Sequence, residues 1–165
     1  IWHLRKRLAH VRSWGSVDHY IQEPSVLADV RRYADKFGKH HLFLVNSYVQ
    51  GLLAPVLYAA YDYDDVYEIV LFEGEINHHF VERVAACTDD RFDVIISIGG
   101  GKVIDVAKMI ASEKRGALVV SPTIASTDAP TSAMSIFYSD EGGVNEIVIH
   151  GASPDLVLVA RARRW

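Results

Sequence analysis

Short apolar runs recur along the chain and are typical of buried strands. They are rich in Val, Ile, Leu and Phe, and each is bounded by polar residues, Gly or Pro. The pattern predicts strands at residues 41–45, 66–72, 93–98, 116–122 and 156–159, and a short strand or extended segment at 16–21.

Between these runs, apolar residues recur at helical spacing. They predict helices at residues 24–37, 48–60, 80–86 and 103–110. Pro24 falls in the first turn of the first helix, where its missing N–H costs nothing, and Gly38 is a candidate for the C-cap. Pro55 falls inside the second helix and is expected to kink or restart it.

The alternation of strands and helices predicts the fold class. Repeated βαβ units form a parallel sheet with right-handed crossovers. Two more strands at 136–138 and 147–149, joined by turn residues 140–143, predict a β-hairpin. We therefore expect an α/β fold, a parallel-sheet, Rossmann-like nucleotide-binding domain with a β-hairpin.

Composition narrows the range of partners. Half of the 165 residues are apolar, which is enough for the core of one domain. The formal charge is −4 and Lys/Arg runs occur only near the two ends, so nucleic acid is not an expected partner. No apolar run has the length of a membrane span, so no membrane partner is expected either. The single cysteine, Cys87, permits no internal disulfide and fits a cytoplasmic location.

Both ends of the chain are unusual. Residues 1–15 form a basic amphipathic segment that begins with Ile rather than Met, and residues 161–165 form a basic tail directly after a strand. We therefore expect the dinucleotide-binding domain at 16–160, flanked by an atypical N-terminal segment and a C-terminal tail, in a chain that is a fragment.

Residues 94–105 read V-I-I-S-I-G-G-G-K-V-I-D and predict a strand that turns into a helix through Gly99, Gly100 and Gly101. Such a turn leaves backbone N–H groups unpaired at a helix N-terminus, where the helix dipole favours an anion. A phosphate or pyrophosphate is the simplest ligand. The spacing is neither G-x-G-x-x-G nor the Walker motif, so a tight turn that binds nothing is the alternative.

A second polar stretch follows the strand at 116–122. It reads T-I-A-S-T-D-A-P-T-S-A-M-S and lies at the carboxyl end of a strand, where parallel sheets bind ligands. One carboxylate among many hydroxyls suits recognition of a ribose or a hydroxyl-rich substrate. From the residues alone, a role for Asp128 as a helix N-cap or turn residue is favoured over ligand binding.

The two stretches together resemble a known family. I-G-G-G-K-V-I-D-V-A-K followed by S-P-T-I-A-S-T-D-A-P-T-S-A-M-S-I-F-Y-S-D-E-G is similar to the glycerol dehydrogenase branch of the iron-containing alcohol dehydrogenase and dehydroquinate synthase-like superfamily. The resemblance is good over 94–159 and looser, but in register, over 20–92.

The resemblance implies an N-terminal nucleotide-binding domain followed by a helical metal-binding domain. Such enzymes oxidise a secondary alcohol of glycerol or a related diol with NAD, and a divalent metal, usually zinc in this branch, acidifies the hydroxyl. By residue match, Asp128 is expected to bind the polyol substrate. The cofactor is expected to contact Asn46, Gly99, Gly100, Gly101, Lys102, Asp105, Thr123, Ser126, Thr127, Ser132, Met134 and Tyr138.

Two departures from the family pattern affect these expectations. Asn46 replaces an acidic residue that would bind the adenosine ribose and repel a 2′-phosphate, so NADP is possible as well as NAD. The family's metal ligands, one Asp and two His, belong to the helical domain, which this sequence does not contain. The adjacent histidine pairs at 40–41 and 78–79 do not replace these ligands, because neighbouring side chains on a strand or helix point to different faces. No metal ligand is therefore assigned.

The resulting hypothesis is the cofactor-binding half of an NAD(P)-dependent glycerol or polyol dehydrogenase, inactive as this fragment. A neutral polyol is favoured because T-D-A-P presents a carboxylate instead of basic residues. The alternatives are a relative of hydroxy-acid or glycerol-1-phosphate dehydrogenases, and a non-catalytic nucleotide-binding or interaction protein. In the last case, the surface left by the missing domain would favour a homo-oligomer.

Overall fold

The computed structural model describes residues 16–88, 90–138 and 143–160. The predicted segments 1–15 and 161–165, and residues 140–142 of the predicted hairpin turn, lie outside these ranges. The strands are β1 (His19–Glu23), β2 (His41–Asn46), β3 (Tyr67–Phe72), β4 (Val94–Gly99), β5 (Ala117–Pro122), β6 (Met134–Tyr138), β7 (Val144–Ile149) and β8 (Leu156–Ala160). The helices are η1 (Val26–Asp29), α2 (Val30–Ala34), η2 (Ser47–Val49), α3 (Gln50–Ala60), α4 (His78–Cys87) and α5 (Gly101–Lys114).

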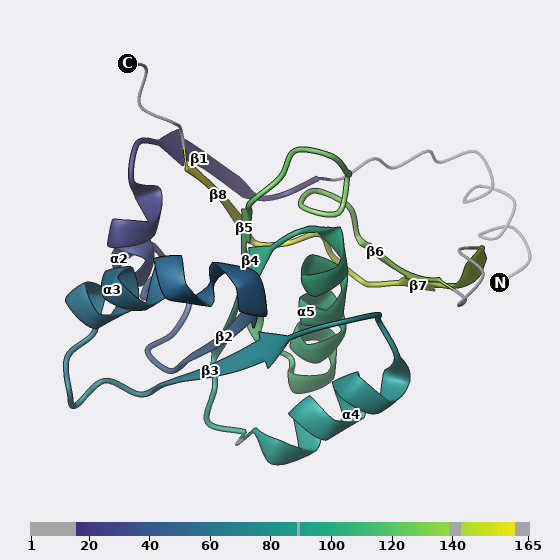
Figure 1. Cartoon of the computed structure of the whole chain (residues 1–165), viewed down its shortest axis with the longest axis horizontal. Helices are drawn as coiled ribbons and strands as arrows, with labels where there is room; N and C mark the ends of the chain where they lie inside the picture. The colour runs from purple at the N-terminus through teal and green to yellow at the C-terminus, as the bar shows by residue number, and fades with distance from the viewer. Residues whose placement is uncertain (1–15, 89, 139–142, 161–165) are drawn as a thin grey trace, which may run out of the picture.

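Six strands form one parallel sheet in the order β1-β8-β5-β4-β2-β3 (Figure 1). The central strands are buried on both faces, which explains their nearly continuous apolar sequences. The predicted α/β, parallel-sheet fold is thus confirmed.

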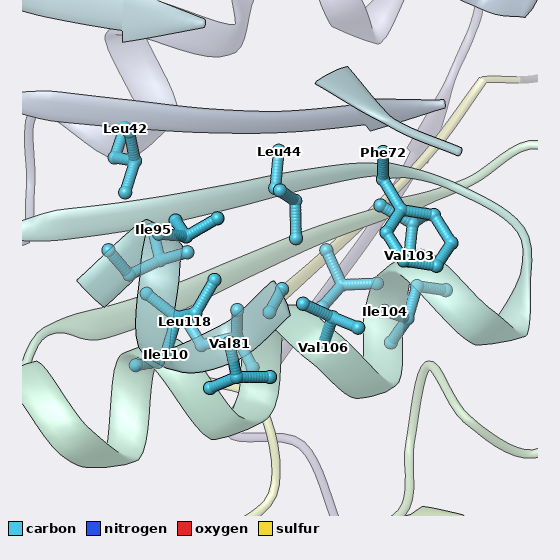
Figure 2. Packing of buried hydrophobic residues seen from close by; sticks show 14 of the residues in the cluster. Leu42, Leu44, Phe72, Val81, Ile95, Val103, Ile104, Val106, Ile110 and Leu118 are labelled. Atoms are coloured by element: carbon cyan, nitrogen blue, oxygen red, sulfur yellow. The ribbon is translucent and has the colours of Figure 1, made fainter. Parts of the chain in front are cut away.

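Helices cover both faces of this sheet (Figure 1). On one face, alternate strand residues such as Leu44 and Ile95 pack against α4 and α5, as Figure 2 shows. On the other face, Phe43 and Ile96 pack against the side of η1, α2 and α3. Each central strand therefore contributes to two hydrophobic clusters, with successive side chains pointing to opposite faces.

The N-terminal elements differ from the sequence-based expectation. Residues 24–37 do not form one helix, because the 3-10 helix η1 and the α-helix α2 meet at Asp29, whose backbone is not helical (φ −103°, ψ 13°). Ser25, directly before η1, has a left-handed backbone with φ 59°. The first strand begins at His19 rather than residue 16, because its pairing with β8 starts where His19 lies opposite Leu156.

Pro55 lies inside α3 without ending or restarting that helix, so the expected restart is wrong. A proline there removes one hydrogen bond, to the carbonyl four residues earlier. Leu53 and Leu57 beside it are buried in the core, and their packing favours the continuous helix. In the described part of the chain, none of the helices is long and apolar enough to cross a membrane.

The predicted hairpin is present as an antiparallel pair, β6 and β7, in a separate two-stranded sheet. Both strands are longer than expected, beginning at Met134 and Val144. β7 is mostly exposed, whereas Phe137 of β6 is buried in the cluster on the α5 side of the main sheet. The hairpin is therefore attached to the domain through its contact with α5 (Figure 1).

Candidate functional site

The strand order creates a crevice between the ends of β2 and β4. From β2 the chain continues to β3 on one side, whereas from β4 it continues to β5 on the other side. Such a switch point leaves a crevice outside the carboxyl ends of the two strands, where α/β sheets bind ligands. Asn46 ends β2 and Gly99 ends β4, so both lie at this crevice.

The glycine turn and Asn46 are packed tightly together. The backbone N–H of Gly100 donates a hydrogen bond to Oδ1 of Asn46 at 3.1 Å. A β-carbon on Gly99 would overlap both this oxygen and Cγ1 of Val103. A β-carbon on Gly101 would lie 3.0 Å from Cγ2 of Thr127. The glycines therefore let the strand, the helix and the 123–138 segment approach closely.

The first turn of α5 is open to a ligand. Gly100 is its N-cap and has no side chain to cap the helix, and the Asn46 amide oxygen accepts only the N–H of Gly100 itself. Helix N-terminal N–H groups carry partial positive charge and bind anions. Lys102 adds a full positive charge at this position, and its Nζ forms an ion pair with Glu75, with both side chains about half exposed.

Two hollows flank this helix start and share Gly101 and Lys102. The first, which we call the turn hollow, has a volume of about 400 Å³ and is lined by Asn46, Ser47, Tyr48, Phe72, Glu73, Gly74, Gly100, Gly101 and Lys102. The second, the hairpin hollow, has a volume of about 320 Å³ and is lined by Ile76, Gly101, Lys102, Asp105, Thr127, Asp128, Ala129, Ser132, Met134, Ile136 and Tyr138. Together they have the size of a small-molecule site.

Most of the predicted site residues lie around these two hollows, and three do not line either of them. Gly99 lies in β4 behind the turn, and Thr123 contacts it by donating its backbone N–H to the Gly99 carbonyl at 3.0 Å. Ser126 is exposed on the segment that follows β5. A larger hollow, of about 470 Å³, lies at the other end of α5, and none of the predicted residues lines it.

Asp128 combines the two roles that the sequence left open. Its backbone carbonyl accepts hydrogen bonds from the N–H groups of Thr131 at 2.9 Å and Ser132 at 3.0 Å, as in a turn. The residue is also exposed and lines the hairpin hollow. A turn position and a ligand-facing position are therefore compatible.

Asp105 lies in the wall of the hairpin hollow, but it is 7% exposed and its carboxylate has protein partners. One oxygen accepts from Nζ of Lys108 at 3.0 Å, and the other accepts from the N–H of Ile136 at 3.2 Å. Burial raises the pKa of Asp105, and the Lys108 ammonium counteracts part of this rise. Burial likewise lowers the pKa of Lys108.

The sequence-based reasoning missed Lys108. This side chain is 2% exposed, and its Nζ donates to Asp105 Oδ1, to Ser132 Oγ at 3.1 Å and to the Met134 carbonyl at 2.6 Å. The available signal was a lysine among the apolar positions of a helix, three residues after an aspartate and so on the same face.

The described residues include no group of three or more His, Cys, Asp or Glu side chains placed to hold a metal ion. Nε2 of His78 instead donates to Oε2 of Glu146 at 2.7 Å, and its ring stacks on Phe137. His41 is fully buried, with ring nitrogens at hydrogen-bond distance from the Tyr61 hydroxyl and the Gly38 carbonyl. Burial lowers the pKa of His41, which favours its neutral form.

Sequence comparison finds known proteins that are similar to this chain. The family model for iron-containing alcohol dehydrogenases matches residues 18–161. Glycolaldehyde reductase of Halobacterium salinarum is 34% identical over 151 residues, which is 85% of this chain and 39% of that protein. Glycerol dehydrogenase of Thermotoga maritima is 30% identical over 141 residues, or 85% of this chain and 38% of that protein.

A solved structure is also similar to this chain. It is the crystal structure of a probable glycerol dehydrogenase from Sinorhizobium meliloti, whose sequence is 31% identical. The two structures superpose with a TM-score of 0.79 over 90% of this chain and 40% of the other. The chain thus spans about 40% of the length of the relatives it matches.

Proposed function

Because the chain belongs to the iron-containing alcohol dehydrogenase family, we propose that its parallel-sheet domain binds a nicotinamide dinucleotide across the start of α5. The observation that carries the proposal is the pair of hollows that share Gly101 and Lys102 at the switch point of the sheet. One elongated ligand can fill both hollows and place its central pyrophosphate at the N-terminus of α5.

In this arrangement the adenosine half occupies the turn hollow. The Asn46 amide oxygen already accepts the Gly100 N–H, so its amide NH₂ is the group left to contact a ribose hydroxyl. An amide carries no charge and does not repel a 2′-phosphate. The domain is therefore proposed to accept NAD and also NADP.

The nicotinamide half then occupies the hairpin hollow beside Asp128. The bound cofactor supplies the hydride acceptor. The exposed Asp128 carboxylate would accept a hydrogen bond from a substrate hydroxyl and orient it. A carboxylate in this place favours a neutral polyol such as glycerol over a phosphorylated substrate, which it would repel.

The complete reaction needs more than the described domain. The family resemblance implies a metal ion that acidifies the alcohol, and the described residues do not gather ligands for one. The rest of the length of the relatives is the proposed source of those ligands. This chain alone is therefore proposed to bind the cofactor without oxidising the alcohol.

Calorimetric titration of the chain with NADH and NADPH tests the proposal. Lys102→Met should weaken both by about tenfold, since it removes the charge beside the proposed pyrophosphate site. Lys39→Met is the matched control, because Lys39 also forms an exposed ion pair, with Asp35, but lies outside both hollows. Absence of nucleotide binding, or an equal loss in both variants, would contradict the proposal.

A second assay addresses turnover. The chain is mixed with glycerol, NAD and zinc, and formation of NADH is followed by its absorbance. No formation above the protein-free rate is expected. Metal-dependent oxidation of glycerol by this chain alone would show that the metal ligands had been assigned to the wrong part of the family fold.

A further inference from the structure

The β6–β7 hairpin is attached to the domain in an unusual way. Its two strands pair only with each other, and neither is hydrogen-bonded to the six-stranded sheet. Yet Met134, Ile136 and Tyr138 of β6 line the hairpin hollow. The position of this wall must therefore depend on contacts of the hairpin with the helices, chiefly α5, and with His78 at the start of α4.

Lys108 provides the central contact. A lysine ammonium has three N–H donors, and Nζ of Lys108 has three acceptors, Asp105 Oδ1 (3.0 Å), Ser132 Oγ (3.1 Å) and the Met134 carbonyl (2.6 Å). Of these acceptors, Ser132 lies just before β6 and Met134 is the first residue of β6. Because all three donors are used and the side chain is 2% exposed, Lys108 does not itself face a ligand.

Asp105 extends the attachment by two more residues, which directly follow Met134. Its Oδ2 accepts the N–H of Ile136 at 3.2 Å, and its backbone carbonyl accepts the hydroxyl of Ser135 at 2.7 Å. Lys108 and Asp105, one helical turn apart on α5, thus hold four positions between 132 and 136. All of these bonds are buried or partly buried, where a hydrogen bond to a charged group is strong.

We propose that Lys108 is the positioning residue of the nicotinamide half of the site, acting through Asp105, Ser132 and Met134. The inference rests on the proposed function. Its physical basis is that every group bonded to Lys108 belongs to a residue lining the hairpin hollow, and none belongs to a residue lining only the turn hollow. Loss of Lys108 should loosen one wall of the cleft and leave the other in place.

The same helix offers a matched control. Lys114 has a side chain that is 5% exposed, and its Nζ donates to the Thr88 carbonyl at 2.9 Å and to Asp90 at 3.2 Å. It therefore also ties α5 to a neighbouring segment, the end of α4, but neither partner lines a hollow described above. Lys114→Met removes a buried lysine without touching the proposed site.

The test compares the affinities of NADH and of ADP-ribose, which lacks the nicotinamide, by calorimetry for three proteins. Lys108→Met should bind NADH about tenfold more weakly than the unmodified chain while its affinity for ADP-ribose stays within about twofold. Lys114→Met should change neither affinity. An equal loss for both ligands, or no loss for NADH, in folded Lys108→Met would overturn the inference.

A milder variant covers the case in which Lys108→Met does not fold. Lys108→Gln keeps two N–H donors and should show a smaller loss, about threefold, again for NADH alone. Failure of the unmodified chain to bind either ligand would contradict the proposed function itself. If the unmodified chain binds both ligands, and Lys108→Gln weakens both equally or neither of them, only the role of Lys108 is contradicted.

Discussion

The two hollows of the candidate site are held in place by different physical means. The turn hollow is built on the ends of β2 and β4, which are paired in a parallel register from His41 to Val45, and on glycines that let backbone segments touch. The hairpin hollow has one wall outside the main sheet, attached by a buried lysine and a buried aspartate. One side should therefore be sensitive to added volume and the other to lost charge.

The largest effect is expected on the hairpin side. Lys108→Met leaves the Asp105 carboxylate buried without its cation, and breaking a buried ion pair in this way costs about 3 to 5 kcal/mol of unfolding free energy. Lys114→Met should cost about 1 kcal/mol or less, because its partner Asp90 is fully exposed. Denaturation with urea measures both, and equal losses would remove the contrast between the two lysines.

Added volume should disturb the turn side. Gly99→Ala places a β-carbon against Asn46 and Val103, and overpacking of this kind costs about 1 to 3 kcal/mol. Gly100→Ala is the control in the same turn, since its β-carbon would lie 3.7 Å from Ile124, an ordinary contact, at φ −84°. Thermal unfolding compares them. If Gly100→Ala destabilised as much as Gly99→Ala, close packing would not explain the turn.

Charge at the turn hollow should decide between the two cofactors. Asn46→Asp can still accept the Gly100 N–H, and its carboxylate would repel a 2′-phosphate. We expect NADPH binding to weaken by about tenfold and NADH binding to change little. Asn46→Ala, which removes the acceptor without adding charge, should affect both cofactors alike. If Asn46→Asp changed the affinities for NADH and NADPH equally, the adenosine ribose could not lie beside residue 46.

The same contrast explains what could be predicted from the sequence. The parallel sheet follows from its apolar runs, and the glycine turn follows from a strand and a helix that meet at three glycines. Both are local signals. Local sequence could mark Lys108 as an unusual lysine on α5, but not its role, because its partners Ser132 and Met134 are distant in sequence and their contact requires the tertiary fold.

Other differences between the sequence-based expectations and the structure also have physical reasons. The helix expected at 24–37 is divided because the backbone at Asp29 leaves the helical region, which apolar spacing does not reveal. The family membership came from two long motifs rather than from periodicity. The roles of the individual site residues, the cytoplasmic location and the homo-oligomer stay predictions.

The smallest expected effect is a pH dependence of the hairpin side. Nε2 of His150 lies 2.8 Å from the Ser135 hydroxyl oxygen, and that hydroxyl donates its proton to the Asp105 carbonyl, so the ring donates at Nε2. Burial, and secondarily the charge of Lys108, lowers the pKa of His150 below its ordinary value of 6.5. The folded protein therefore holds this imidazole neutral at a pH where the unfolded chain protonates it.

Stability should consequently fall once the pH drops through about 6.5, the ordinary pKa that applies to the unfolded chain, and level off below the lowered pKa of the folded protein, with a slope of at most about 1.4 kcal/mol per pH unit for one proton. His150→Gln should make the slope of stability against pH shallower. The slope that remains reports other groups such as His41, because burial also lowers the pKa of His41. The protection of the β6 amides against hydrogen exchange, taken relative to the intrinsic exchange rate at each pH, should fall at lower pH more than that of the β4 amides, because β6 is attached through the residues around His150. An identical loss of protection in both strands would show that acid acts on the whole domain, and the two hollows would then share one response to pH.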